Sequence, residues 1–204
     1  MAEQLRGKKS GSIGASDDYG CYRTLFEYHQ LCWAHPHRKF RDLAESGSLS
    51  GKALKACQRA YHDFADVYKK ARATRELLLG NTLSAEQKVA ERLKLEKLFG
   101  QLFEPSPHDP EKLKTIRESL EKRKNDYFTF FDFPYLPLDN NKAERALRKI
   151  VIKRKKSFGC QSQNGADILS ILYSVVFSMV KSNPGKNFFQ LYGETIEYEE
   201  KVSE

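Results

Sequence analysis

The strongest constraint on the fold is a long helical pattern in the middle of the chain. From residue 54 onward, apolar residues recur in steps of three and four, and this places them on one face of a helix: Leu54, Cys57, Tyr61, Phe64 and Tyr68. Gly80 and Asn81 predict where this helix ends. A period of 3.6 residues is incompatible with a strand, so any fold of this chain must contain a helix of several turns here.

Two more helices are predicted after it. Ser84 and Gln87 have the spacing of a capping box, and the helix that follows has the apolar positions Val89, Leu95, Leu98, Phe99 and Leu102. Three prolines then interrupt the chain, and Asp109 followed by Pro110 predicts the N-cap and first turn of a third helix. Its inward positions are predicted to be Leu113, Ile116 and Leu120.

The flanking segments have a mixed α/β character. Leu31 to His35 reads as a short buried strand, and a helix is predicted from His37 to Glu45. Past an aromatic stretch at residues 127–135, Asp139 can cap a short helix, and a largely buried helix is predicted over residues 166–181. We therefore predict four parts: a core segment at 1–45, a helical insertion at 46–126, a second core segment at 127–192 and an acidic tail at 193–204.

Charge is unevenly distributed along the 204-residue chain, whose net charge is +8. Between residues 142 and 156 a single acid, Glu144, stands among eight basic residues: Lys142, Arg145, Arg148, Lys149, Lys153, Arg154, Lys155 and Lys156. Residues 194–204 reverse the sign, with five glutamates. A basic stripe of this kind favours a partner that carries phosphates. The alternative is a solvated helix face.

Cysteine usage points to a reducing compartment, and hydropathy argues against a membrane span. The four cysteines have no spacing typical of a disulfide framework, which fits the cytoplasm. The longest apolar run, Ile171 to Val180, is interrupted by Tyr173, Ser174 and Ser178, so no membrane span is expected. Cys32 and His35 resemble half of a zinc site, but no second half follows at the required spacing. We expect no zinc, with both side chains in the core.

Three acids could take part in phosphoryl chemistry. Two-metal catalysis on DNA needs carboxylates that converge on Mg²⁺, which prefers oxygen ligands. Asp17 and Asp18 follow a possible strand, and Glu144 lies inside the basic segment. Composition alone favours Glu144 as an i,i+4 partner of Arg148. Trp33 and the aromatic residues of 127–135 are expected to pack in the core rather than stack on bases.

Four motifs in order resemble bacterial transposases of the insertion-sequence 66 family. The residues from Leu138 to Lys156 resemble the family signature around its last catalytic acid, and Cys32 to Phe40 resembles a second motif. Gly165 to Tyr173 resembles the opening of the final helix, and Asp17 to Tyr22 resembles the stretch with the second catalytic aspartate. Together these motifs cover nearly the whole chain.

The resemblance implies a ribonuclease-H-like catalytic core with a large all-helical insertion. Such enzymes are of the DDE class, in which three acids hold two Mg²⁺ (or Mn²⁺) ions for DNA strand cleavage and transfer at the terminal repeats of the element. Carried over by motif, Asp17 is the second aspartate and Glu144 the final glutamate, both as catalytic residues and metal ligands. Asp18 stands where the family has glycine, so the choice between Asp17 and Asp18 stays open.

Other residues receive roles from the same motifs. Support beside the site is expected from Cys32, His35, Asn140 and Asn141. Contacts with DNA phosphates are expected from Lys142, Arg145, Arg148, Lys153, Arg154, Lys155 and Lys156. The partners implied are the terminal-repeat DNA and either a second copy or a full-length transposase, in the bacterial cytoplasm at the nucleoid, with no membrane.

One departure from the family pattern concerns the first catalytic aspartate. Only 16 residues precede Asp17, and the one acid among them is Glu3. We therefore expect a C-terminal portion of a catalytic domain that is inactive alone, with an incomplete sheet edge. The alternatives are a non-catalytic DNA-binding remnant that regulates transposition and a decayed reading frame.

Overall fold

The structure is a computed structural model, and it describes residues 11–18, 26–142, 144, 145, 148, 152, 162–187 and 189–194. The chain forms two units, residues 1–142 and residues 143–204, and each is described by itself. Helices dominate both units, so the fold is mostly helical with one small parallel sheet.

The sheet consists of β1 (Ile13–Ser16) and β2 (Tyr28–Leu31), which run parallel with Ile13 opposite Tyr28 and Ser16 opposite Leu31. The sequence predicted a strand at residues 31–35, but the strand ends at Leu31, so that prediction was wrong in its position. Helix α1 (Ala34–Ala44) begins before Pro36 rather than after it. Pro36 is tolerated there because an N–H in the first turn of a helix has no intrahelical partner to lose.

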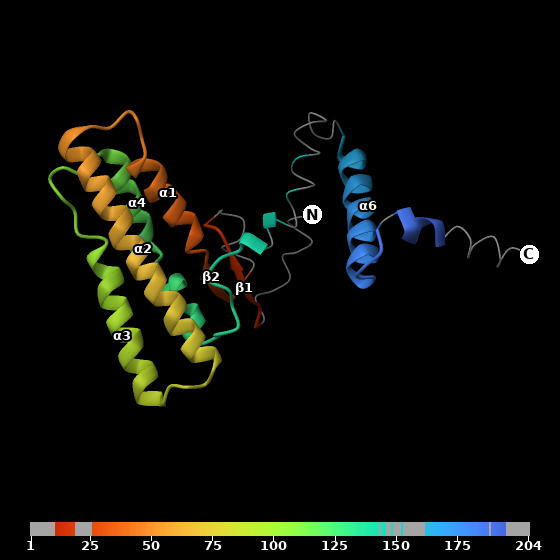
Figure 1. The fold of residues 1–204 in the computed structure, drawn as a ribbon, viewed down its shortest axis with the longest axis horizontal. Helices are drawn as coiled ribbons and strands as arrows, with labels where there is room; N and C mark the ends of the chain where they lie inside the picture. The colour runs from red at the N-terminus through yellow and green to blue at the C-terminus, as the bar shows by residue number, and fades with distance from the viewer. Residues whose placement is uncertain are drawn as a thin grey trace, which may run out of the picture. The chain divides into compact units, whose positions relative to one another are not determined.

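Three longer helices follow in the first unit (Figure 1): α2 (Gly51–Leu79), α3 (Ala85–Gln101) and α4 (Glu111–Lys122). Helix α2 packs against both α1 and α3, and α4 packs against α1. The end of α2 at Gly80 and the capping box of Ser84 and Gln87 are confirmed. The helices expected within 46–126 are thus present, while the division of the chain at residues 45 and 126 stays a prediction.

Two sequence expectations within these helices were wrong. Val89 is 59% exposed, because it lies about 120° around α3 from the buried Leu95. Asp109 does not cap α4, whose N-cap is Pro110. Its buried carboxylate instead accepts the backbone N–H of Ser106 at 3.0 Å and lies 3.0 Å from Nε of Arg117. Both contacts use Oδ2, so this oxygen is engaged away from the helix terminus, while Oδ1 is buried without a hydrogen-bond partner among the described residues.

Trp33 lies at the centre of an aromatic core. Its indole ring is fully buried and stacks on the ring of Tyr68. Four further ring centroids lie within 6.0 Å of the indole centroid, those of Phe64, Phe99, Tyr127 and Phe128. The last two belong to the segment that follows α4, which forms the 3₁₀ turns η2 (Lys124–Tyr127) and η3 (Thr129–Phe131). Phe130 and Phe131 are also fully buried. Core packing is therefore confirmed for the first part of the aromatic stretch, whereas Tyr135 at its end is 60% exposed.

In the second unit the structure shows α6 (Gln163–Ser182), with the hydroxyl of Ser162 accepting the N–H of Gly165 at its start. Its bounds agree with the predicted helix, but none of its residues is buried, contrary to expectation. By length and composition alone α6 is apolar enough to cross a membrane, which the sequence reading did not expect. The core helix of a soluble protein can have the same length and composition.

Candidate functional site

The carboxyl ends of β1 and β2 form one edge of the sheet. Ser16 lies opposite Leu31 in the register, and the N–H of Cys32 donates to the carbonyl of Ser16 at 2.9 Å. Asp17 and Asp18 follow β1 directly, so both carboxylates lie beyond this edge. In sheets of parallel strands, ligands bind outside the carboxyl ends.

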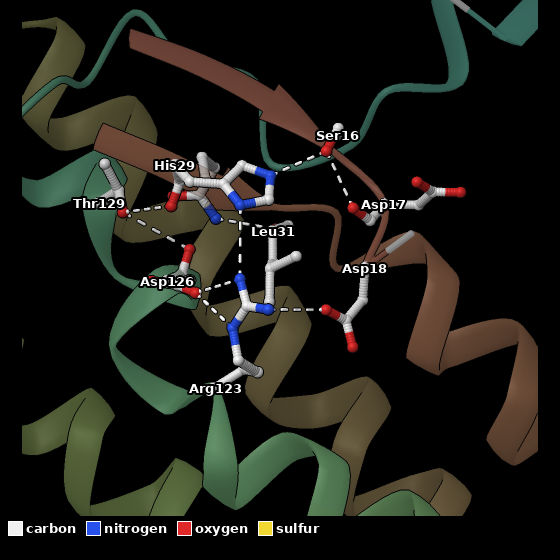
Figure 2. A network of polar contacts seen from close by, with 9 residues as sticks. Ser16, Asp17, Asp18, His29, Leu31, Arg123, Asp126 and Thr129 are labelled. Atoms are coloured by element: carbon white, nitrogen blue, oxygen red, sulfur yellow. Dashed lines mark hydrogen bonds and ion pairs between the residues drawn. The ribbon is translucent and has the colours of Figure 1, made fainter. Parts of the chain in front are cut away.

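Arg123 connects this edge to the end of α4 (Figure 2). Its Nη1 donates to Oδ1 of Asp18 at 3.0 Å, and its Nη2 and Nε both lie 2.6 Å from Oδ2 of Asp126. The guanidinium is 17% exposed, and the two carboxylates are 25% and 32% exposed. One partly buried cation therefore binds two acids from opposite ends of the unit's sequence.

His29 connects Arg123 to the loop after β1 through hydrogen bonds. Nη2 of Arg123 lies 3.5 Å from its Nδ1, and its Nε2 lies 2.8 Å from the hydroxyl of Ser16. Arginine can only donate, so Nδ1 accepts and the ring proton is assigned to Nε2, which donates to Ser16. The Ser16 hydroxyl in turn donates to the carbonyl oxygen of Asp17 at 2.8 Å. The result is a continuous chain of hydrogen bonds from Arg123 to the backbone of Asp17.

Electrostatics favours the neutral form of this imidazole. Burial lowers the pKa of His29 below its usual value, and the positive charge of Arg123 lowers it further, whereas Asp126, Asp18 and Asp17 act in the opposite direction. A neutral ring with one acceptor and one donor nitrogen is what the hydrogen-bond chain requires. Thr129 supports the same residue by donating to its backbone carbonyl at 2.8 Å.

Asp17 and Asp18 are oriented differently. Figure 2 shows the carboxylate of Asp18 directed toward Arg123 and that of Asp17 directed away from it. Asp18 is therefore used in an ion pair with Arg123, while the side chain of Asp17 is presented at the sheet edge. An ion-paired carboxylate is a poorer ligand for a cation, because the guanidinium competes for its oxygens.

Cys32 and His35 line a small cavity of about 20 Å³ together with Asp18. Cys32 is a buried free thiol, and His35 is partly buried near the start of α1. Within residues 11–18, 26–142 and the described part of the second unit, no group of three His, Cys, Asp or Glu side chains converges on a metal position.

The segment just before Glu144, residues 138–142, belongs to the first unit and is hydrogen-bonded to the start of α1. The N–H of Trp33 donates to the carbonyl of Leu138 at 2.8 Å, and Arg38 reaches Oδ1 of Asn141 at 3.5 Å. The carboxylate of Asp139 accepts the N–H of Asn141 at 3.2 Å, in the manner of an N-cap. Residues 141, 142, 144 and 145 are helical, as predicted. Oδ1 of the neighbouring Asn140 is buried, with no hydrogen-bond partner in the described part of the chain.

The remaining predicted site residues lie elsewhere. Glu144, Arg145 and Arg148 belong to the second unit, so the structure does not relate them in space to Asp17. Lys142 is exposed at the end of the first unit. The four basic residues at positions 153–156 lie outside the described residues.

Comparison with known proteins identifies the family. The model of the Transposase IS66 family matches residues 1–168, which include the sheet edge, the helices of the first unit and Glu144. The chain belongs to this family.

A curated relative is the "Uncharacterized protein y4hP" of Sinorhizobium fredii (strain NBRC 101917 / NGR234). It is 29% identical to this chain over an alignment of 164 positions, and the alignment covers 72% of this chain and 28% of the relative. The chain thus spans little more than a quarter of the length of that relative. No solved structure matches the chain.

Sequence reasoning missed His29, Arg123 and Asp126 as members of the site. Ninety-four residues separate His29 from Arg123 in the chain, and neither belongs to a recognisable motif. The one available signal was Asp18, an additional acid where the family has glycine, which needs a cation if it is partly buried.

Proposed function

We propose that this IS66 family chain contributes two of the three acids of a DDE transposase, Asp17 and Glu144, as Mg²⁺ ligands for strand cleavage and transfer on DNA. The observation that carries the proposal is the placement of Asp17 beyond the carboxyl end of β1, directed away from Arg123 (Figure 2). Asp18 is the weaker candidate because it is paired with that arginine. A ribonuclease-H-like core is part of the same proposal, with β1 and β2 as two of its strands.

The donor set fits a hard divalent cation. Asp17 offers carboxylate oxygens at a sheet edge, and its backbone is held by the Ser16 hydroxyl. Bound Mg²⁺ would polarise a phosphodiester and activate the attacking oxygen. In this mechanism Asp17 and Glu144 bind the ion, and Arg123 and His29 keep the loop of Asp17 in place.

DNA binding is assigned to the basic residues around Glu144. Lys142, Arg145 and Arg148 follow one another at helical spacing, and the four basic residues at 153–156 extend the charge along the chain. We propose that these seven side chains contact backbone phosphates of the terminal repeats. Cys32, His35, Asn140 and Asn141 would support the site structurally.

Mn²⁺ titration of the ¹⁵N-labelled chain tests the metal ligands. We expect amide signals of residues 16–18 to broaden, because a paramagnetic ion bound by Asp17 relaxes nearby nuclei. Asp17→Asn should abolish this broadening, and Glu144→Gln should weaken it. The matched control Asp18→Asn should preserve it. Equal broadening in the Asp17→Asn and wild-type chains would show that Asp17 is not a ligand, and an unchanged Mn²⁺ affinity in Glu144→Gln would remove Glu144 from the site.

A second candidate function is non-catalytic regulation of transposition by DNA binding. The net charge of +8 and the basic segment favour it independently of any metal ligand. In that case DNA affinity would depend on Lys153 and Arg154, and neither Mn²⁺ nor Asp17→Asn would affect it. A DNA titration with and without Mn²⁺ separates the two functions.

A further inference from the structure

A basic hollow opens on the first unit between α1, α2 and the segment that leads to Glu144. Its volume is about 460 Å³, and its lining includes Arg38 of α1, Lys69 and Arg72 of α2, and Asn141. His37 and Tyr68 complete its polar lining. None of these residues belongs to the basic segment at 142–156, so this is a separate positively charged surface.

The charge of the hollow is strongly one-sided. Three cations line it and no acid does. One of these cations has an acidic neighbour outside the lining, because Oδ2 of Asp139 lies 3.7 Å from Nη2 of Arg72. The pKa of His37 is lowered by burial and, in addition, by the positive charges of Arg41 and Arg72, as expected beside a cationic surface. An anion placed here would reduce the mutual repulsion of the cations.

The donors are arranged for an oxygen-rich ligand. The guanidinium of Arg72 lies over the ring of Tyr68, with its central carbon 4.2 Å from the ring centroid, and its contacts with the Tyr68 hydroxyl and Asp139 both use Nη2. Lys69 is exposed and makes no hydrogen bond or ion pair with any residue that the structure describes. Arg38 donates to the side chain of Asn141 at 3.5 Å. Guanidinium and ammonium groups set around an open hollow suit phosphate oxygens.

The position of the hollow in the chain indicates which phosphate-bearing ligand it would bind. Asn141 comes three residues before Glu144 in the chain, and Leu138 of the same segment is bonded to Trp33. We infer that this hollow holds backbone phosphates of the DNA substrate through Arg38, Lys69 and Arg72. This inference rests on the proposed function and assigns α1 and α2 a part in DNA binding.

The salt dependence of DNA affinity tests the inference, measured by fluorescence anisotropy with the full chain and a labelled duplex. Each phosphate contact contributes about 0.9 to the slope of log K against log salt concentration. Lys69→Gln with Arg72→Gln should therefore reduce the slope by about 2 and weaken binding roughly 50-fold at 0.1 M salt. The matched control is Lys52→Gln with Lys55→Gln, which removes two cations at the same spacing from the same helix. It should change the slope by less than about 0.5.

A single exposed substitution guards against misfolding, because Arg72 also contacts Tyr68 and Asp139. Lys69→Gln alone should reduce the slope by about 1. If the pocket variants keep the wild-type slope, or if the control lowers it equally, the inference is wrong while the metal site stays intact. If the wild-type chain does not bind DNA, the inference and the proposed DNA contacts both fail, and the Mn²⁺ titration still reports on Asp17 separately.

Discussion

At the scale of single residues, the defining feature is one arginine that organises several polar groups. Arg123 binds Asp18 and Asp126 and lies beside His29, which is bonded through Ser16 to the backbone of Asp17. The motif around Asp17 was readable in the sequence, but the cation that separates Asp17 from Asp18 was not. A salt bridge that closes a loop of about a hundred residues leaves no local pattern.

Arg123→Gln is expected to destabilise the chain by about 2 kcal/mol, because it leaves two partly buried carboxylates without their shared cation. Urea unfolding followed by circular dichroism measures this. Arg92→Gln is the control: this arginine also pairs with two acids, Glu96 and Asp132, but its side chain is 38% exposed. We expect it to cost less than about 1 kcal/mol. A loss for Arg123→Gln as small as that expected for the control would mean that the Arg123 network adds little to stability.

At the scale of elements, the helices followed from local sequence and the strands did not. The capping box at Ser84 and the apolar face from Cys57 to Tyr68 are local signals, and both were confirmed. Strand β2 was misplaced because Cys32 and Trp33 are apolar and buried whether or not they lie in a strand. Strand β1 has only four residues, and its formation depends on pairing with β2, which lies outside the local sequence of β1.

Gly14 is a position in β1 where only a glycine fits beside the ring of Phe26. A Cβ at this position would overlap with the ring of Phe26, so Gly14→Ala should destabilise the chain by about 1–3 kcal/mol. Gly100, at the end of α3, has no atom within 4 Å of an added Cβ, and Gly100→Ala should stabilise the chain by up to about 1 kcal/mol. Thermal unfolding of both variants checks the two signs. A neutral Gly14→Ala would show that the ring of Phe26 can move away.

At the scale of the whole molecule, the first unit contains nearly all of the buried apolar side chains that the structure describes. The aromatic core around Trp33 draws on residues between Leu31 and Leu138. Among the described residues of the second unit, Leu191 is the one buried hydrophobic residue. We therefore predict that residues 1–142 fold by themselves. A chain ending at Lys142 should unfold cooperatively, with a midpoint in urea close to that of residues 1–204. A gradual, non-cooperative loss of helix signal would contradict this prediction.

The sequence by itself determined the family, the helices of residues 51–122 and the identity of the candidate acids, because each depends on residues close together in the chain. Only the tertiary structure decided that Asp18 pairs with Arg123, that the aromatic stretch after α4 surrounds Trp33, and that cations from α1 and α2 line one hollow. These outcomes depend on which distant segments meet. Burial and charge select those contacts only when the whole unit packs, because a partly buried carboxylate or an aromatic ring must find a partner that local sequence does not specify.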